Sequence, residues 1–223
     1  MTKKLFISAI VKFTLGVLLV GLLVFLPAGT LSFFGGWLFM GLLFIPMFIA
    51  GIVMMIKSPD LLKSRLDAKE DDSEQGLVVR LSGLMFLTGF IVAGLDYRFS
   101  WCTLPKWVSP VAALIFLIGY GLYAEVLREN AYLSRTIEIQ ENQRVIDTGL
   151  YSLVRHPMYS ATLLLFLSMP LVLGSVYSFI IFLVYPLLII KRLKNEEAFL
   201  EKELQGYKEY KEKVKYRLIP FIW

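Results

Sequence analysis

The chain has little of the chemistry from which disulfides, zinc sites and common nucleotide folds are built. It contains one cysteine, Cys102, and one histidine, His156, among its 223 residues. A single cysteine excludes a disulfide within the chain, and one cysteine with one histidine excludes the usual zinc ligand sets. No G-x-G-x-x-G motif occurs, which excludes a Rossmann-type cofactor site. We therefore expect no metal site.

Charged side chains are also scarce, at 18% of the residues compared with about 25% in a typical soluble domain. Hydrophobic residues make up 57%, and the mean hydropathy is +0.66. Because the apolar residues are concentrated in long runs, the sequence predicts an integral membrane protein. The net charge of +5 is then a signal of membrane topology, so we expect no nucleic-acid partner.

Several apolar runs reach or approach the roughly 20 residues that a helix needs to cross a bilayer. The predicted spans are residues 5–26, 33–56, 77–97, 108–127, 157–174 and 176–190. The last two are joined by Gly174-Ser175, which is too short for a folded loop and predicts a tight helical hairpin. The charged segment 57–75 is expected to be a solvated loop with one helical turn, and the tail 191–216 an amphipathic surface helix broken at Gly206. The predicted fold class is all-α, a polytopic membrane bundle of about six transmembrane helices with a cytoplasmic C-terminal helix.

The basic residues predict the orientation of these spans. If the N-terminus is inside, all but three of the 23 lysines and arginines lie in inner segments. The exceptions are Arg98 and Lys106 in outer links and Lys12 within the first span. Because basic residues mark cytoplasmic loops, both termini are predicted to be cytoplasmic, in a multi-pass protein of a prokaryotic inner membrane. Asp96 is expected to pair with Arg98 at the outer surface.

The motif Arg155-His156-Pro157-Met158-Tyr159 stands where a charged segment meets the fifth apolar run. Proline is favoured at the first helical position, so Pro157 is predicted to begin the span, with His156 near the N-cap. The positive helix end beside Arg155 is suited to a carboxylate, while His156 and Tyr159 are spaced to pack on a flat ring. The alternative is a plain helix start with an arginine anchored among the lipid headgroups.

A second polar cluster follows the sixth run. Arg192 and Glu196 lie four residues apart and so share one face of a helix. A guanidinium fork suits an anionic group, and a carboxylate suits a cationic one. Glu197 points about 100° away, and is expected either to reach the site from the side or to be solvated. The alternative for Arg192 and Glu196 is a surface ion pair of a few tenths of a kcal/mol.

A third candidate part of the site lies in the polar segment between the fourth span and the R-H-P-x-Y motif. The sequence Asp147-Thr148-Gly149-Leu150-Tyr151 is typical of a turn, because Asp, Thr and Gly supply local hydrogen bonds and a positive φ. Tyr151 is close enough to His156 in sequence to fold back over the same pocket. The alternative is a loop tyrosine at the level of the headgroups.

Together these motifs resemble the membrane methyltransferase family that includes isoprenylcysteine carboxyl methyltransferase and the phospholipid methyltransferases. The similarity begins at Gln143, and it combines R-H-P-x-Y with a downstream E-E pair and ends at Arg217-Leu218-Ile219-Pro220. The first three spans show no such similarity. One departure is Ala161, where the family usually has glycine, and a narrower pocket is expected there.

The resemblance implies S-adenosylmethionine as cofactor. It divides the chain into an N-terminal transmembrane part, residues 1–127, and a cofactor-binding core, residues 128–223. It implies catalytic roles for Arg192 and Glu196, with Arg192 also binding the substrate's carboxylate. The cofactor contacts that it implies are Gln143, Arg144, Val145, Ile146, Tyr151, His156, Pro157, Met158, Tyr159, Glu196 and Glu197.

The predicted function is methyl transfer from S-adenosylmethionine to a lipophilic acceptor at the cytoplasmic membrane surface. Carboxyl O-methylation of an isoprenylcysteine-like substrate is favoured, because Arg192 would receive a carboxylate. The expected partners are a lipophilic or lipidated acceptor and membrane lipid. Three alternatives remain: a phospholipid N-methyltransferase, an NADPH-dependent membrane reductase of the sterol reductase type, and a non-enzymatic transporter or scaffold. Transporters often carry charges at the bilayer midplane, whereas here most charges lie near the ends of spans.

Overall fold

The computed structural model describes residues 3–67, 73–130, 132–133, 139 and 142–223. All of the regular structure in these residues is helical, which confirms the predicted all-α class. Among them, five helices are long and apolar enough to cross a membrane. The protein is therefore a polytopic bundle of membrane helices.

The long helices follow the predicted spans, with one difference. They are α1 (Lys3–Ala28), α2 (Phe34–Lys57), α4 (Ser73–Phe99), α5 (Val108–Glu129) and the consecutive pair α7 (Val176–Phe182) and α8 (Tyr185–Glu203). The fifth predicted span is α6 (Pro157–Val172), which is apolar but only 16 residues long. At about 1.5 Å per residue it is shorter than the roughly 30 Å hydrocarbon core of a bilayer.

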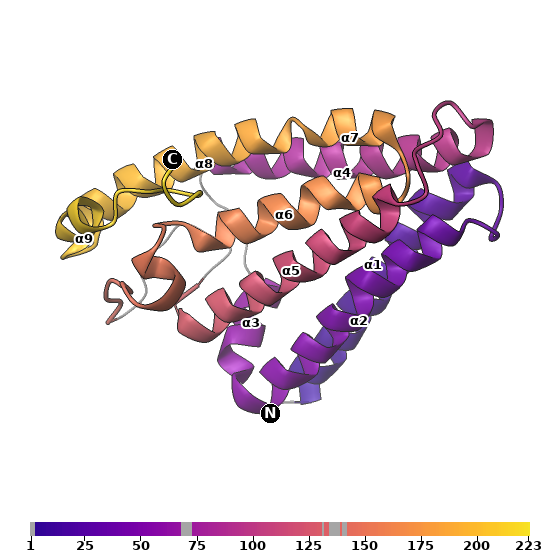
Figure 1. The fold of residues 1–223 in the computed structure, drawn as a ribbon. Coiled ribbons are helices and arrows are strands. Elements are labelled where there is room, and N and C mark those ends of the chain that lie inside the picture. The colour runs from indigo at the N-terminus through magenta and orange to yellow at the C-terminus, as the bar shows by residue number, and fades with distance from the viewer. Residues whose placement is uncertain (1–2, 68–72, 131, 134–138, 140–141) are drawn as a thin grey trace.

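The bundle is built around the pair α5 and α6, which run side by side (Figure 1). Gly119 on α5 permits this approach, because a Cβ atom there would lie 2.9 Å from the side chain of Leu165 on α6. Helix α4 packs on both α1 and α7. Helices α1 and α2 lean away from α5 and α6 toward the N-terminus (Figure 1).

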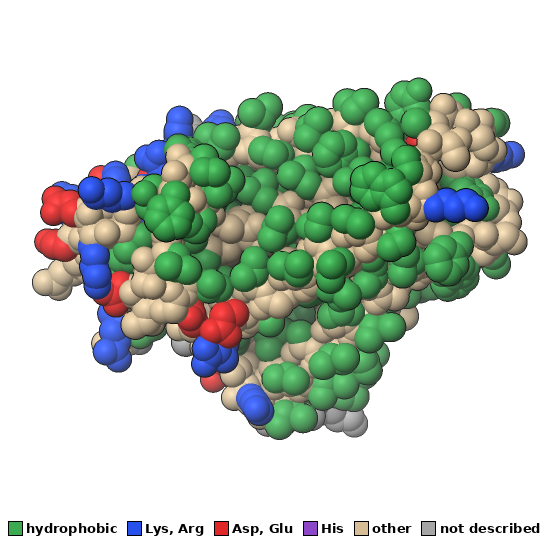
Figure 2. Space-filling model, viewed as in Figure 1, with side chains coloured by type: hydrophobic (Ala, Val, Ile, Leu, Met, Phe, Trp, Pro, Cys, Tyr) green, Lys and Arg blue, Asp and Glu red, His purple; other side chains and the backbone are tan. Residues whose placement is uncertain are grey.

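Charged side chains gather at one end of the molecule, over α8 and α9 (Tyr207–Lys213), while hydrophobic side chains cover its body (Figure 2). This end also holds α3 (Pro59–Asp67) and the 3-10 helix η1 (Gly149–Ser152), and we call it the charged end. The opposite end consists of short turns, among them the hairpin turn at Gly174, where φ is +79°. The hydrophobic body is the part suited to the bilayer.

One local prediction about the charged end was wrong. The segment 57–75 contains the nine-residue helix α3 rather than a single turn, because Leu62 is buried and holds the helix against the bundle. Lys12 Nζ donates to the carbonyl of Leu66 at 2.5 Å, and thus places a cation at the end of α3. The predicted helical tail is present as the second half of α8, which runs from Tyr185 to Glu203, and as α9 after the break at Gly206.

Asp96 does not pair with Arg98 as expected. Its side chain is buried, and its carboxylate accepts from Ser175 Oγ at 2.6 Å and from the Cys102 backbone N–H at 3.0 Å. Ser175 is the N-cap of α7 and accepts from the Ser178 N–H at 3.1 Å. The predicted helical hairpin is therefore present, and Asp96 fixes its turn to α4.

Candidate functional site

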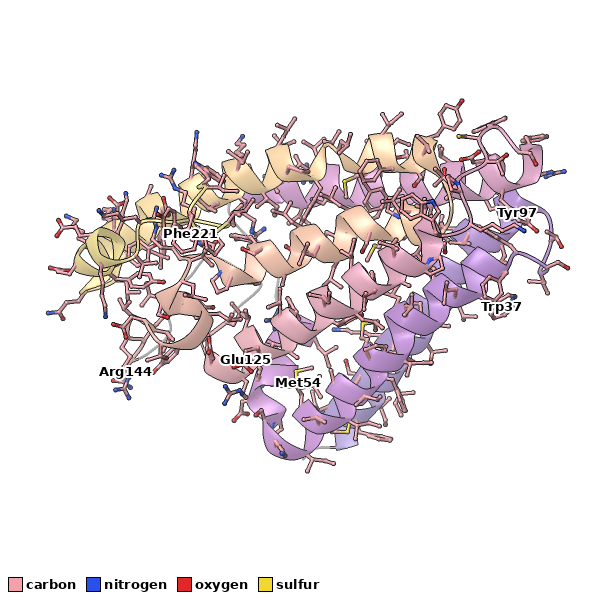
Figure 3. The ribbon with its side chains drawn as sticks, viewed as in Figure 1. Trp37, Met54, Tyr97, Glu125, Arg144 and Phe221 are labelled. Atoms are coloured by element: carbon pink, nitrogen blue, oxygen red, sulfur yellow. The ribbon has the colours of Figure 1, made fainter. Side chains whose placement is uncertain are left out.

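The charged end contains a pocket of about 870 Å³, counting the space open to solvent at its mouth. The pocket lies between the end of α5, the stretch 143–146, η1, the start of α6, the polar half of α8, and α9. Among the side chains that Figure 3 labels, Glu125 near the end of α5, Arg144 near the outer edge, and Phe221 lie at this end. All of the predicted site residues line the pocket except Pro157 and Glu197.

The predicted N-cap arrangement is present at the start of α6. Pro157 occupies the first turn and His156 is the N-cap residue. The His156 ring stacks on that of Tyr159, with centroids 5.7 Å apart and the planes at 24°. Both side chains are buried, so the two rings form one wall of the pocket.

The hydroxyl of Tyr159 joins the two predicted clusters. It donates to a carboxylate oxygen of Glu196 and accepts from Arg192 Nε at 3.1 Å. Arg192 and Glu196 of α8 are therefore bridged by the hydroxyl of Tyr159, a residue of α6. His156 Nδ1 lies 4.0 Å from Glu196 Oε1, so the histidine ring lies beside the same cluster of Tyr159, Arg192 and Glu196.

Glu197 lies behind the pocket wall. Its side chain is buried, and its carboxylate accepts from Arg155 Nε at 2.7 Å and from Arg217 Nε at 3.0 Å. His156 Nε2 lies 3.3 Å from the same carboxylate. A buried carboxylate held by two guanidiniums is compensated, so Glu197 fixes α8 to the start of α6 and to the C-terminal residues.

Arg155 holds the C-terminal residues across the start of α6. Its Nη1 donates to the carbonyls of Val214 at 2.7 Å and Lys215 at 3.0 Å. Its backbone N–H donates to the Tyr216 carbonyl at 2.9 Å, and the His156 N–H donates to the Arg217 carbonyl at 2.9 Å. The Arg155 guanidinium borders the pocket and is engaged by the Glu197 carboxylate and by these two carbonyls.

Tyr151 is held at both of its polar ends. Its hydroxyl accepts from Asn130 Nδ2 at 2.9 Å, and its carbonyl accepts from the Tyr210 hydroxyl at 2.7 Å. Burial raises the pKa of Tyr151 to about 12, so the phenol is neutral at physiological pH. The predicted fold-back of Tyr151 over the pocket is thus present, with its orientation fixed.

The turn before Tyr151 is held by the last residue of α5. The Leu150 N–H donates to the Glu129 carboxylate at 2.9 Å. Gly149 has φ of +51°, and a Cβ atom there would lie 1.4 Å from a Glu129 carboxylate oxygen. The turn therefore requires glycine both for its backbone conformation and for the approach of Glu129.

Several lining residues were not predicted, and some of them had a sequence signal. Leu200 follows Glu196 by four residues, which places it on the same face of α8, and Leu204 is the C-cap residue of that helix. Tyr207 and Tyr210 lie one turn apart on α9. The remaining ones gave no signal, because their positions depend on how distant segments meet: Asn130, Tyr132 and Leu133. Ala161 is fully buried and does not line the pocket, so the expected narrowing there is not observed.

Residues 108–206 match the family model described as phospholipid methyltransferase. The match begins at α5 and includes the R-H-P-x-Y motif and the E-E pair, so the resemblance seen in the sequence is confirmed over these residues. A search of curated proteins gives no match. The family match indicates methyl transfer at a membrane, with S-adenosylmethionine as the methyl donor that such a family implies.

Proposed function

We propose that this chain, whose residues 108–206 belong to the phospholipid methyltransferase family, methylates a lipophilic acceptor at the surface of a membrane. The observation that supports this most directly is the Tyr159 hydroxyl, which joins Arg192 and Glu196 in one pocket at the charged end. S-adenosylmethionine supplies an activated methyl group on its sulfonium. The protein then has mainly to align donor and acceptor and to exclude water.

The pocket fits a ligand that is apolar at one end and charged at the other. The pocket is lined both by apolar side chains and by the charged side chains of Arg192 and Glu196. Leu133, Val145 and Leu204 provide apolar surface for a flat base. Glu196 provides negative charge for the cationic groups at the other end, and its carboxylate accepts from the Tyr159 hydroxyl.

The proposed acceptor group is a carboxylate, which methyl transfer converts to an ester. Arg192 precedes Glu196 by one turn of α8, and it lies about 6 Å nearer the apolar body of the bundle. A carboxylate carried by a membrane-anchored molecule would therefore meet Arg192 while the cofactor meets Glu196. The guanidinium fork can bind such a carboxylate in bidentate fashion. An isoprenylcysteine-like molecule has both required features, a lipid chain and a terminal carboxylate.

The second candidate is N-methylation of a phospholipid amine, which the description of the matching family favours. A methyl-transfer assay with labelled S-adenosylmethionine separates the two. Full-length protein in lipid vesicles is offered a farnesylated cysteine analogue or phosphatidylethanolamine. Base-labile label on the cysteine analogue supports ester formation, and base-stable label on the phospholipid supports N-methylation.

Thermal unfolding with candidate cofactors separates methyl transfer from the remaining classes. A ligand that binds the native state raises the melting temperature. Stabilisation by S-adenosylhomocysteine supports the methyltransferase. Stabilisation by NADPH instead would support a reductase, and no effect of either ligand would support a transporter or scaffold.

We further propose that both termini and the charged end face the cytoplasm of a prokaryotic inner membrane, and that residues 128–223 form the cofactor-binding core. The excess of lysine and arginine at the charged end supports this orientation. Gln143, Arg144, Ile146, Tyr151, Met158 and Tyr159 are then proposed cofactor contacts in addition to those named above. Glu197 and Pro157 act by holding the others in place.

A further inference from the structure

Tyr207 carries a buried hydroxyl for which the described part of the chain offers no hydrogen-bond partner. Its side chain lines the pocket, and the residue is 4% exposed. Buried hydroxyls normally find a partner, because an unsatisfied donor lowers the stability of the fold. A residue that accepts this cost at the wall of a pocket is a candidate for contact with the ligand.

The neighbouring tyrosine of the same helix behaves differently. Tyr210 is equally buried, and its hydroxyl donates to the Tyr151 carbonyl at 2.7 Å. The two rings lie 5.8 Å apart. The lack of a partner is therefore a property of the direction in which the Tyr207 hydroxyl points, and not of α9 as a whole.

The ring and the hydroxyl of Tyr207 have different surroundings. The ring packs in a cluster with Leu204, Val145 and Leu200. Burial, and then the negative charges of nearby Glu197 and Glu196, raise the pKa of the Tyr207 phenol well above its usual value. The phenol consequently stays protonated, so its hydroxyl is a hydrogen-bond donor within the lining of the pocket.

We propose that the Tyr207 hydroxyl donates a hydrogen bond to the α-carboxylate at the amino-acid end of the cofactor, an assignment that rests on the proposed function. The apolar side chains around the ring are suited to the adenine, so the charged part of the pocket is left for the amino-acid end. Glu197 is already engaged by Arg155 and Arg217. The α-carboxylate is the anionic acceptor that the cofactor itself brings to such a donor.

The test compares two ligands that differ in the amino-acid end. S-adenosylhomocysteine carries the α-carboxylate, and 5′-methylthioadenosine lacks the whole amino-acid group. Binding of each to full-length wild type and Tyr207→Phe is measured by calorimetry in detergent. Tyr207→Phe should weaken the binding of S-adenosylhomocysteine by about tenfold, which is the effect of one hydrogen bond to a charged group. The affinity for 5′-methylthioadenosine should be unchanged. Equal weakening of both ligands, or no weakening of either, overturns the assignment.

The melting temperature of the ligand-free protein is the second readout. Because Tyr207→Phe removes a hydroxyl without a partner, it should leave the melting temperature unchanged or raise it. Tyr210→Phe is the matched control, since it removes a bonded hydroxyl and should lower the melting temperature. A drop for Tyr207→Phe as large as that for Tyr210→Phe would make Tyr207 merely structural. If the wild type binds neither ligand, the proposed function itself fails, and the Tyr207 assignment fails with it.

Discussion

At the scale of single residues, the adjacent Glu196 and Glu197 have different surroundings. Glu196 lines the pocket and is bonded to Tyr159, whereas Glu197 is buried between Arg155 and Arg217. We propose a corresponding division of roles, in which Glu196 binds the cofactor and Glu197 stabilises the fold. The E-E motif alone could not reveal this division, because it depends on which side of α8 meets the C-terminal residues.

The matched variants Glu196→Gln and Glu197→Gln test this division. Glu196→Gln should weaken the binding of S-adenosylhomocysteine by about tenfold or more, and should leave the melting temperature of the ligand-free protein nearly unchanged. Glu197→Gln should destabilise the fold by about 3–5 kcal/mol, because it leaves the buried Arg155 and the half-buried Arg217 without their counter-charge. Calorimetry and thermal unfolding measure the two effects. The same loss of stability in both variants would contradict the division.

Arg192 is predicted to act on the acceptor rather than on the cofactor. Arg192→Ala should leave the affinity for S-adenosylhomocysteine within the range of wild type and reduce kcat/KM by about a hundredfold, as loss of a charged contact to the acceptor requires. Lys194→Ala, which removes an exposed charge from the same helix, is the control. Equal losses in cofactor affinity and turnover would count against the role of Arg192.

At the scale of helices, the sequence predicts best those features that depend on neighbouring residues. Pro157 marks the start of α6, Gly174-Ser175 the hairpin turn, and Gly206, with φ of +84°, the break before α9. Helix α3 and the contacts of Asp96 were not predicted, because both depend on partners that are distant in sequence. For the same reason the contact between residues 155–156 and 216–217 has no local signal.

The turn that carries Tyr151 offers a prediction at this scale. Gly149→Ala would place a methyl group on the Glu129 carboxylate and strain a backbone at φ of +51°. It should destabilise the protein by about 1–3 kcal/mol and weaken binding of S-adenosylhomocysteine, because Tyr151 loses its fixed orientation. Gly121→Ala in α5 is the control, since a Cβ atom there meets no other atom within 4 Å. Identical effects of the two substitutions on melting temperature would show that the contact between Gly149 and Glu129 is not required.

At the scale of the whole molecule, composition was sufficient to predict an all-α membrane bundle, since hydropathy and length define the spans. Composition overestimated the length of α6, because an apolar run does not distinguish a helix that spans the membrane from a shorter helix packed among others. The pocket could be predicted in outline from the R-H-P-x-Y motif and the E-E pair. Its outer wall could not, because Tyr207 and Tyr210 of α9 line the pocket through contacts with residues that are distant in sequence, such as the bond from Tyr210 to Tyr151.

The central claim is that the pocket at the charged end holds S-adenosylmethionine. Equilibrium binding of the labelled cofactor to the full-length protein in lipid vesicles tests it most directly. We expect saturable binding of one molecule per chain, displaced by S-adenosylhomocysteine but not by NADPH. Absence of saturable binding, or displacement by NADPH, would contradict the account.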